Sequence, residues 1–103
     1  MLTETYVYLI SDGTGHYKIG ESSNPKGRLM DLQSANARRL HLVAQSDPSP
    51  LWHHLEQRIH WEFRDQRVLG EWFKFNDCEA YCAAMAVMVG PEDSSMRWDL
   101  RLR

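Results

Sequence analysis

The sequence lacks several features that would assign it to a broad class of protein. No apolar run in its 103 residues approaches the roughly 18 residues of a membrane span. Residues 1–5 lack the basic and apolar segments of a secretory signal. The sequence also lacks an excess of positive charge, since 12 basic and 14 acidic residues give a net charge of −2. The overall charge of the protein therefore cannot by itself hold nucleic acid. The length of 103 residues suits a single domain, and these absences favour a cytoplasmic location.

Cysteine is scarce, with only Cys78 and Cys82. They lie four positions apart in a segment that we expect to be helical, and a rigid helix suits disulfide geometry poorly. A structural zinc site would need two further ligands with local spacing, which the sequence does not offer. We therefore expect buried free thiols in a reducing compartment.

The pattern of residues predicts an α+β fold. Thr5–Ile10 is β-branched and aromatic, as in a strand, and the turn at Asp12–Gly15 predicts a hairpin with a second strand. Asn24 before Pro25 predicts a helix start, and Asn76 with Glu79 resembles a capping box. The expected order is β-β-α-β-α-α around a three-stranded antiparallel sheet, with strands at 5–10, 16–21 and 39–45, helices at 25–34, 50–66 and 77–89, and a short extended piece at 71–75.

The chain divides into a domain at 1–90 and a C-terminal tail at 91–103. In the tail, apolar and charged residues alternate from Met96 to Arg103, which is the period of a strand. Such a strand would pair with this sheet or with a second copy in a homodimer. A partly ordered tail is the alternative.

The two hairpin strands have faces of different character. If Tyr8 lies opposite Lys18, one face carries the apolar or aromatic set Val7, Leu9, Tyr17 and Ile19, which helices would cover. The other face carries polar and titratable groups together with the small Gly20. This second face is either a site or simply the exposed side of a small sheet.

The helix expected at 50–66 carries a carboxylate at the margin of its apolar stripe. Glu56 lies at this margin, and His60 lies one turn further on the same side. A single carboxylate there suits Mg²⁺, which keeps most of its waters, better than zinc. Glu62 is a rival, because ideal geometry places it even nearer the apolar centre.

The motifs taken together resemble the GIY-YIG nuclease superfamily. Val7-Tyr8-Leu9-Ile10 stands in the slot of the first motif, and Lys18-Ile19-Gly20 stands in the slot of Tyr-Ile-Gly. Arg28 follows on the first helix, and Glu56 lies in the long helix. Tyr17-Lys18-Ile19-Gly20 with the later Gly70-Glu71-Trp72-Phe73 is most similar to the phage-type subfamily. The sequence departs from the family where Tyr6 replaces the first glycine and Lys18 replaces the second tyrosine.

The resemblance implies a divalent-metal-dependent endonuclease that hydrolyses phosphodiester bonds in DNA. Glu56 would hold one Mg²⁺ or Mn²⁺ ion. Tyr8, with its pKa lowered by Lys18, would orient or deprotonate the attacking water. Arg28 would bind the non-bridging oxygens, and His60 would act through a water.

Positive charge is concentrated in one part of the chain. Residues 14–45 carry five basic and two acidic side chains, a net +3 against −5 elsewhere, and Lys26, Arg38 and Arg39 are candidate DNA contacts. Either cleavage is loosely specific, or a separate partner or a second subunit supplies targeting. Two alternatives stay open: a catalytically inactive module of this fold that binds nucleic acid or protein, and an oligomerising accessory protein.

Overall fold

The structure of the protein is a computed structural model that describes residues 4–50 and 52–89. Over these residues the chain forms five strands, three α-helices and a short 3-10 turn at Arg64–Gln66. In chain order the strands and helices are β1 (Tyr6–Ser11), β2 (His16–Ser22), α1 (Pro25–Ser34), β3 (His41–Gln45), α2 (Trp52–Glu62), β4 (Arg67–Leu69), β5 (Trp72–Lys74) and α3 (Asp77–Val89).

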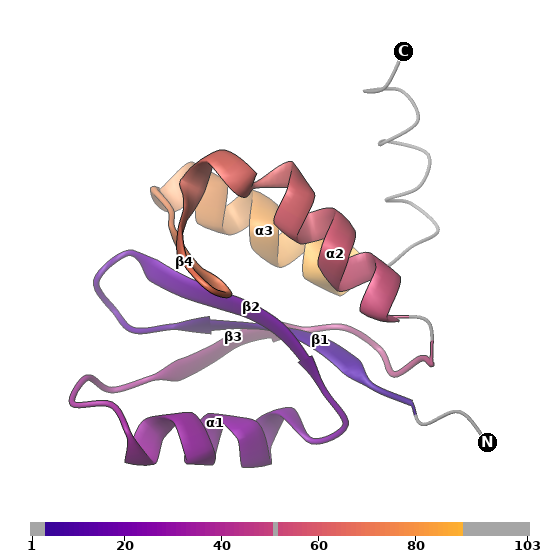
Figure 1. Ribbon diagram of the computed structural model, residues 1–103, viewed down its shortest axis with the longest axis horizontal. Coiled ribbons are helices and arrows are strands. Elements are labelled where there is room, and N and C mark those ends of the chain that lie inside the picture. Colours follow the sequence, from indigo (N-terminus) through magenta and orange to yellow (C-terminus); the bar gives the residue numbers. More distant parts are fainter. Residues whose placement is uncertain (1–3, 51, 90–103) are drawn as a thin grey trace.

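The described strands form one antiparallel sheet in the order β3-β1-β2-β5-β4. Helix α1 lies on one face of this sheet, and α2 and α3 lie on the other (Figure 1). The α+β class is confirmed. The expectation of three strands is wrong, because β4 and β5 form a further hairpin.

The additional hairpin follows from a short stretch of sequence. Its two strands have three residues each, and Gly70 between them has a φ of 56°. Three residues are too few to show a period of two, so the pattern had indicated only one extended piece. Pairing of β5 with β2 gives this piece its place in the sheet.

The register of the β1–β2 hairpin differs from the predicted one by two residues. Tyr8 lies opposite Gly20, and Lys18 lies opposite Ile10. The connection is longer than expected, because Gly13 and Gly15 adopt φ values of 81° and 91° that allow a wider turn. A shift of two keeps each side chain on its predicted face.

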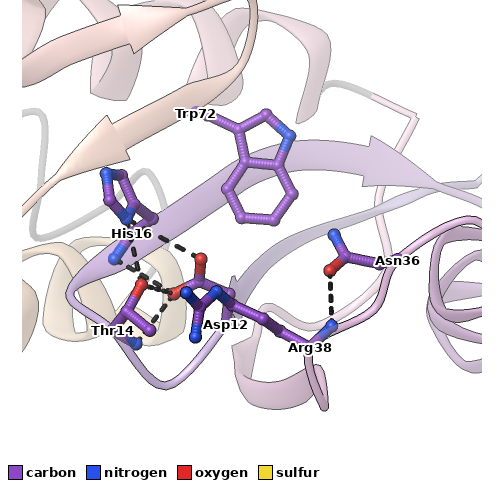
Figure 2. Close-up of a pocket in the computed structure, with 6 residues that line it drawn as sticks. All are labelled: Asp12, Thr14, His16, Asn36, Arg38 and Trp72. Atoms are coloured by element: carbon purple, nitrogen blue, oxygen red, sulfur yellow. Dashed lines mark hydrogen bonds and ion pairs between the residues drawn. The ribbon is translucent and has the colours of Figure 1, made fainter.

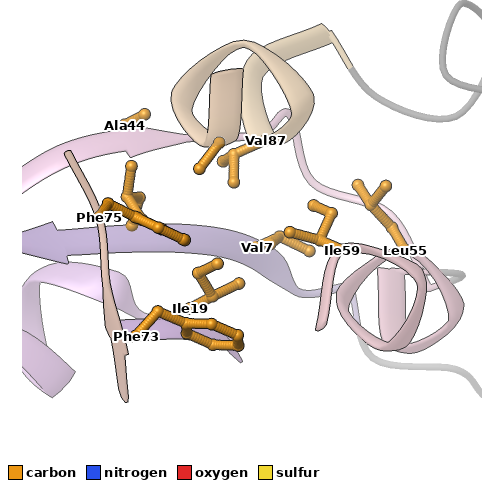
Figure 3. Close-up of a cluster of buried hydrophobic side chains, with 10 residues drawn as sticks. Val7, Ile19, Ala44, Leu55, Ile59, Phe73, Phe75 and Val87 are labelled. Atoms are coloured by element: carbon orange, nitrogen blue, oxygen red, sulfur yellow. The ribbon is translucent and has the colours of Figure 1, made fainter. Parts of the chain in front are cut away.

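The larger core fills the space between the sheet and the helices α2 and α3. Val7 and Ile19 from the sheet meet Leu55 and Ile59 from α2 and Val87 from α3, all at most 2% exposed (Figure 3). Phe73 and Phe75 stack with ring centroids 5.6 Å apart and extend this core along the additional hairpin. The prediction that helices cover Val7, Leu9 and Ile19 is therefore confirmed, and Tyr17, the fourth residue predicted on that face, is partly buried against the same core.

The opposite face of the sheet is also covered. Tyr8, Ile10 and Leu40 form a second buried cluster, against which Leu29 and Leu32 of α1 pack. Lys18 on this face is only 7% exposed. The face that the sequence had suggested as an open, polar surface is thus closed along much of its length by α1.

The predicted starts of α1 and α3 are present, whereas the helix expected at 50–66 is α2 at Trp52–Glu62, followed by the 3-10 turn at Arg64–Gln66. The Asn24 side chain accepts a hydrogen bond from the Gly27 amide at 3.2 Å. Asn76 and Glu79 form a reciprocal capping box, in which each side chain accepts from the other's amide, at 2.8 and 2.9 Å. These local bonds fix where α1 and α3 begin.

The cysteines differ from their prediction. Cys78 and Cys82 are free but exposed, so the expected burial of both thiols is wrong. Among the described helices, none has both the length and the apolar character needed to cross a membrane. The predicted tail strand and its dimer contact, at 91–103, lie outside the described residues.

Candidate active site

The candidate site lies at an edge of the sheet that is only partly covered. Strand β5 pairs with His16–Lys18 alone, and the Ile19 amide donates to the Glu71 carbonyl at 3.0 Å. Among the described strands, none pairs with Gly20–Ser22 on that side. Side chains from α1 on one face and α2 on the other can therefore approach each other around Gly20.

Tyr8 and Gly20 fit together closely at this edge. A Cβ atom added to Gly20 would lie 2.5 Å from the Tyr8 hydroxyl and 2.9 Å from Oε1 of Glu71. The glycine therefore leaves the space that the phenol and this carboxylate occupy. The Arg28 side chain, which reaches over from α1, hydrogen-bonds the Tyr8 hydroxyl.

The pKa of Tyr8 is raised, not lowered. Burial is the main cause; Glu71 and Glu56 add to it, and Arg28 opposes it. The prediction that Lys18 makes Tyr8 more acidic is wrong, since Lys18 is directed to another partner. Tyr8 is therefore a neutral phenol at neutral pH and can both donate and accept a hydrogen bond.

Lys18 forms an ion pair with Glu71. Its Nζ lies 3.0 Å from Glu71 Oε1 and 5.8 Å from the centroid of the Trp72 ring. The Lys18 side chain is 9% exposed, whereas that of Glu71 is 40% exposed. The carboxylate thus stabilises a charge that would be costly to bury alone.

Glu56 is the most strongly perturbed acid of the site. Its pKa is raised to about 7, first by burial and then by the charges of Glu71 and Glu21, against which His53 and Lys18 act. The charges of Glu71 and Glu21 thus oppose the ionisation of Glu56. Glu62, the other carboxylate considered on this helix, is its last residue.

Glu21 joins the site from the opposite face of β2. Its Oε1 lies 2.9 Å from Nδ1 of His53, and its Oε2 accepts from the Thr5 hydroxyl at 3.0 Å. These contacts hold the Glu21 carboxylate against the first turn of α2, on the side from which Glu56 approaches.

His60 is tied to the backbone. Its Nε2 donates to the Ile19 carbonyl at 2.7 Å, and its ring packs edge-on against Phe73 with centroids 5.0 Å apart. This arrangement joins α2 to the strand that carries Lys18 and Gly20. The hydrogen bond to the Ile19 carbonyl occupies Nε2 of His60, the residue that was predicted to act through a water.

Two of the predicted DNA contacts, Arg38 and Arg39, border different hollows. Lys26, Arg38 and Arg39 are all exposed. Arg39 borders a hollow between α1 and Leu40, whereas Arg38 borders a different one at the tip of the β1–β2 hairpin. Neighbours in the sequence therefore contribute to separate places.

The predicted residues Tyr8, Lys18, Arg28 and Glu56 thus converge on one edge, and sequence reasoning missed two of their neighbours. Glu71 belongs to the Gly70-Glu71-Trp72-Phe73 motif, and the acidic residue inside this motif was the available signal. Glu21 directly follows Gly20, and this position was the available signal.

Fold and site together define a small α+β domain with a cluster of titratable groups at an open sheet edge. The family model of the T5orf172 domain matches residues 5–87, which is most of the chain. The chain belongs to the T5orf172 domain family. No curated protein and no solved structure matches it at a significant level.

Proposed function

We propose that this domain is an endonuclease that hydrolyses phosphodiester bonds in DNA with one divalent cation, Mg²⁺ or Mn²⁺. The observation that carries the proposal is the convergence of Tyr8, Arg28, Glu56 and the Lys18–Glu71 pair around Gly20. These groups come from four elements and the turn between β4 and β5, and they combine a phenol, a guanidinium and a perturbed carboxylate. Such a combination is typical of a catalytic site.

The carboxylates fit a magnesium-type ion. Glu56 is half-buried with a pKa of about 7, so the site favours either a proton or a cation over a bare negative charge. Within the described residues, no three His, Cys, Asp or Glu side chains form a metal cluster. A hard cation that keeps most of its waters needs only one carboxylate, which matches Glu56.

A bound cation would supply positive charge for the leaving 3′ oxygen and the phosphate. Arg28 has five N–H donors, and its bond to Tyr8 leaves others for the non-bridging phosphate oxygens. The same guanidinium thereby fixes the phosphate relative to the phenol. Tyr8, as a neutral hydroxyl, orients the attacking water towards phosphorus.

Lys18 and His60 position these groups. Lys18 assists water activation by holding Glu71 in place. The charge of the Glu71 carboxylate raises the pKa of both Tyr8 and Glu56. His60 holds α2 against β2 through the Ile19 carbonyl, and so fixes Glu56 relative to Gly20. We assign His60 to positioning, because the nitrogen that faces β2 is already engaged.

One observation favours the alternative of an inactive nucleic-acid-binding module. Lys18 is paired with Glu71, and the pKa of Tyr8 is raised, so the phenol is not in the ionised form that would make it a strong base. A module of this kind would bind DNA in a salt-dependent way without cutting it.

A nicking assay on supercoiled plasmid tests the proposal. Wild-type protein with Mg²⁺ or Mn²⁺ is expected to nick, whereas Glu56→Gln and wild type with EDTA are not. Asp65→Asn is the matched control, because it makes the same change of carboxylate to amide at an exposed residue outside the site. Failure of wild type to cut duplex, branched or single-stranded DNA would overturn the nuclease.

A further inference from the structure

A hollow of about 280 Å³ lies at the tip of the β1–β2 hairpin, on the face of β2 that carries Lys18. We call it the Trp72 hollow; its walls are formed by Asp12, Thr14, His16, Asn36, Arg38 and Trp72 (Figure 2). None of these residues belongs to the proposed catalytic cluster. The walls combine one indole ring with several charged and polar groups.

The indole offers an aromatic surface for a flat ligand. Trp72 is half-buried and packs against the second core cluster, and Lys18 Nζ lies 5.8 Å from its ring centroid, so the ring is held in place. In Figure 2 the indole lies across the hollow from Asp12 and Arg38. An anchored aromatic ring with an open side is what nucleobases stack on.

Arg38 offers a free positive charge. Its backbone amide donates to Oδ1 of Asn36 at 3.0 Å and its carbonyl accepts from Gln33, which fix the loop. Within the described part of the chain, its guanidinium has no ion pair. A guanidinium of this kind suits a phosphate oxygen.

Asp12 supplies a hydrogen-bond acceptor across the hollow from the indole. Its Oδ1 accepts from the Thr14 amide and hydroxyl at 2.8 and 2.7 Å, and its Oδ2 lies 3.7 Å from Nδ1 of His16. Although burial raises the pKa of Asp12, the hydrogen bonds of Thr14 and His16 outweigh it, and the pKa lies below its usual value. The ionised carboxylate can accept from a base amino group.

The Trp72 hollow and the catalytic cluster lie along one face of β2. His16, Lys18 and Gly20 are every second residue of β2 and therefore lie on that face. Lys18 contacts both Trp72 and Glu71. His16 and Gly20 are about 13 Å apart along the strand at 3.3 Å per residue. That span corresponds to about four nucleotides of a stacked strand.

We propose that the Trp72 hollow binds one unpaired nucleotide of the DNA, with its base against Trp72 and its phosphate on Arg38. A base paired within a duplex cannot present its face to the indole. The inference rests on the proposed function for the identity of the ligand as DNA. It assigns the domain to branched, gapped or bulged DNA in preference to intact duplex.

The test compares a blunt duplex with the same duplex carrying one unpaired nucleotide. Binding is measured by fluorescence anisotropy at fixed salt, with full-length Glu56→Gln so that the substrate stays intact. This parent is expected to prefer the second DNA. Trp72→Ala should reduce that preference by roughly five-fold to more than a hundred-fold, the loss of one stacked base, and Trp72→Phe should retain most of it.

Arg38→Ala keeps the test independent of folding, because Arg38 is exposed and outside both cores. It should weaken binding of the DNA with the unpaired nucleotide more than that of the duplex. Trp61 and Arg64 form a matched control, since their exposed side chains stack 4.1 Å apart elsewhere on the surface. Trp61→Ala and Arg64→Ala should leave the preference unchanged.

Equal binding of the two DNAs by the parent, or a preference that survives both Trp72→Ala and Arg38→Ala, would overturn the hollow's assignment while leaving the nuclease intact. A preference lost in both variants, together with absence of nicking by wild type, would support the hollow and overturn the nuclease. No binding of the parent to either DNA would overturn the hollow's assignment, and together with absence of nicking by wild type it would overturn the nuclease as well.

Discussion

The Tyr8 hydroxyl occupies the space in which a side chain at position 20 would lie. The Cβ of an alanine there would be 2.5 Å from that hydroxyl and 2.7 Å from the carbon that bears it. Two strands that pair with Tyr8 opposite Gly20 thus leave room for one side chain only. This relationship explains in physical terms why a glycine stands at this place in the motif.

Gly20→Ala should destabilise the fold by about 1–3 kcal/mol and displace Tyr8, because a buried site cannot absorb the added methyl group. Thermal unfolding measures the loss. Tyr8→Phe removes the hydroxyl but not the ring carbon, so the double variant should recover part of the stability. Strictly additive effects of the two changes would contradict a direct clash between a Cβ at position 20 and the Tyr8 hydroxyl.

The Lys18–Glu71 pair should respond asymmetrically to substitution. Glu71→Gln leaves a buried ammonium without its counter-charge and should cost about 1–3 kcal/mol. Lys18→Met leaves a carboxylate that is 40% exposed and should cost less. The double variant should be more stable than Glu71→Gln alone in urea unfolding. Lys74→Met, at an exposed lysine, is the control; if it costs as much as Glu71→Gln, burial is not the cause.

Arg28→Ala should affect activity far more than stability. The residue is exposed on α1, yet it bonds Tyr8, so its loss removes a phosphate ligand without opening the core. We expect nicking to fall by about 10²–10³-fold, as for loss of one donor to developing charge, with an unchanged melting temperature. Arg67→Ala is the control, because it removes an exposed arginine outside the site. If it lowers the nicking rate equally, the loss in Arg28→Ala comes from non-specific electrostatic attraction to DNA.

The stability of the protein should depend on the ionisation of Glu56. Its pKa is about 7 in the folded state against an ordinary 4.5, so the folded state retains a proton that the unfolded chain releases between these values. Stability is therefore lost as pH rises through that interval. Glu56→Gln should be more stable than wild type at pH 8, by on the order of 1 kcal/mol after allowance for half exposure, and nearly equal at pH 4. Equal melting temperatures at both pH values would contradict this.

Cleavage should depend on pH through the same carboxylate. A proton and a cation compete for Glu56, so at limiting Mg²⁺ the rate should rise by about tenfold per pH unit below pH 7 and level off above it. Raising the Mg²⁺ concentration should move the midpoint to lower pH. A midpoint independent of Mg²⁺ would assign the titration to another group.

Much of the fold follows from local signals. Asn24 before Pro25, and Asn76 with Glu79, satisfy backbone amides within a few residues, so the starts of α1 and α3 were predictable. The β4–β5 hairpin was not, because three-residue strands are defined by their partners and have no period of their own. The exposure of Cys78 and Cys82 also depends on how α3 packs.

The sequence alone determined which residues share a face of the hairpin, since alternation along a strand is a property of the backbone, and it placed Tyr8, Lys18, Arg28 and Glu56 as candidates. Only the tertiary structure decided that α1 covers the Tyr8 face, that Glu71 rather than Tyr8 is the partner of Lys18, and that Trp72 borders a hollow. Contacts between segments far apart in the chain set burial and charge neighbours, and these in turn set each pKa.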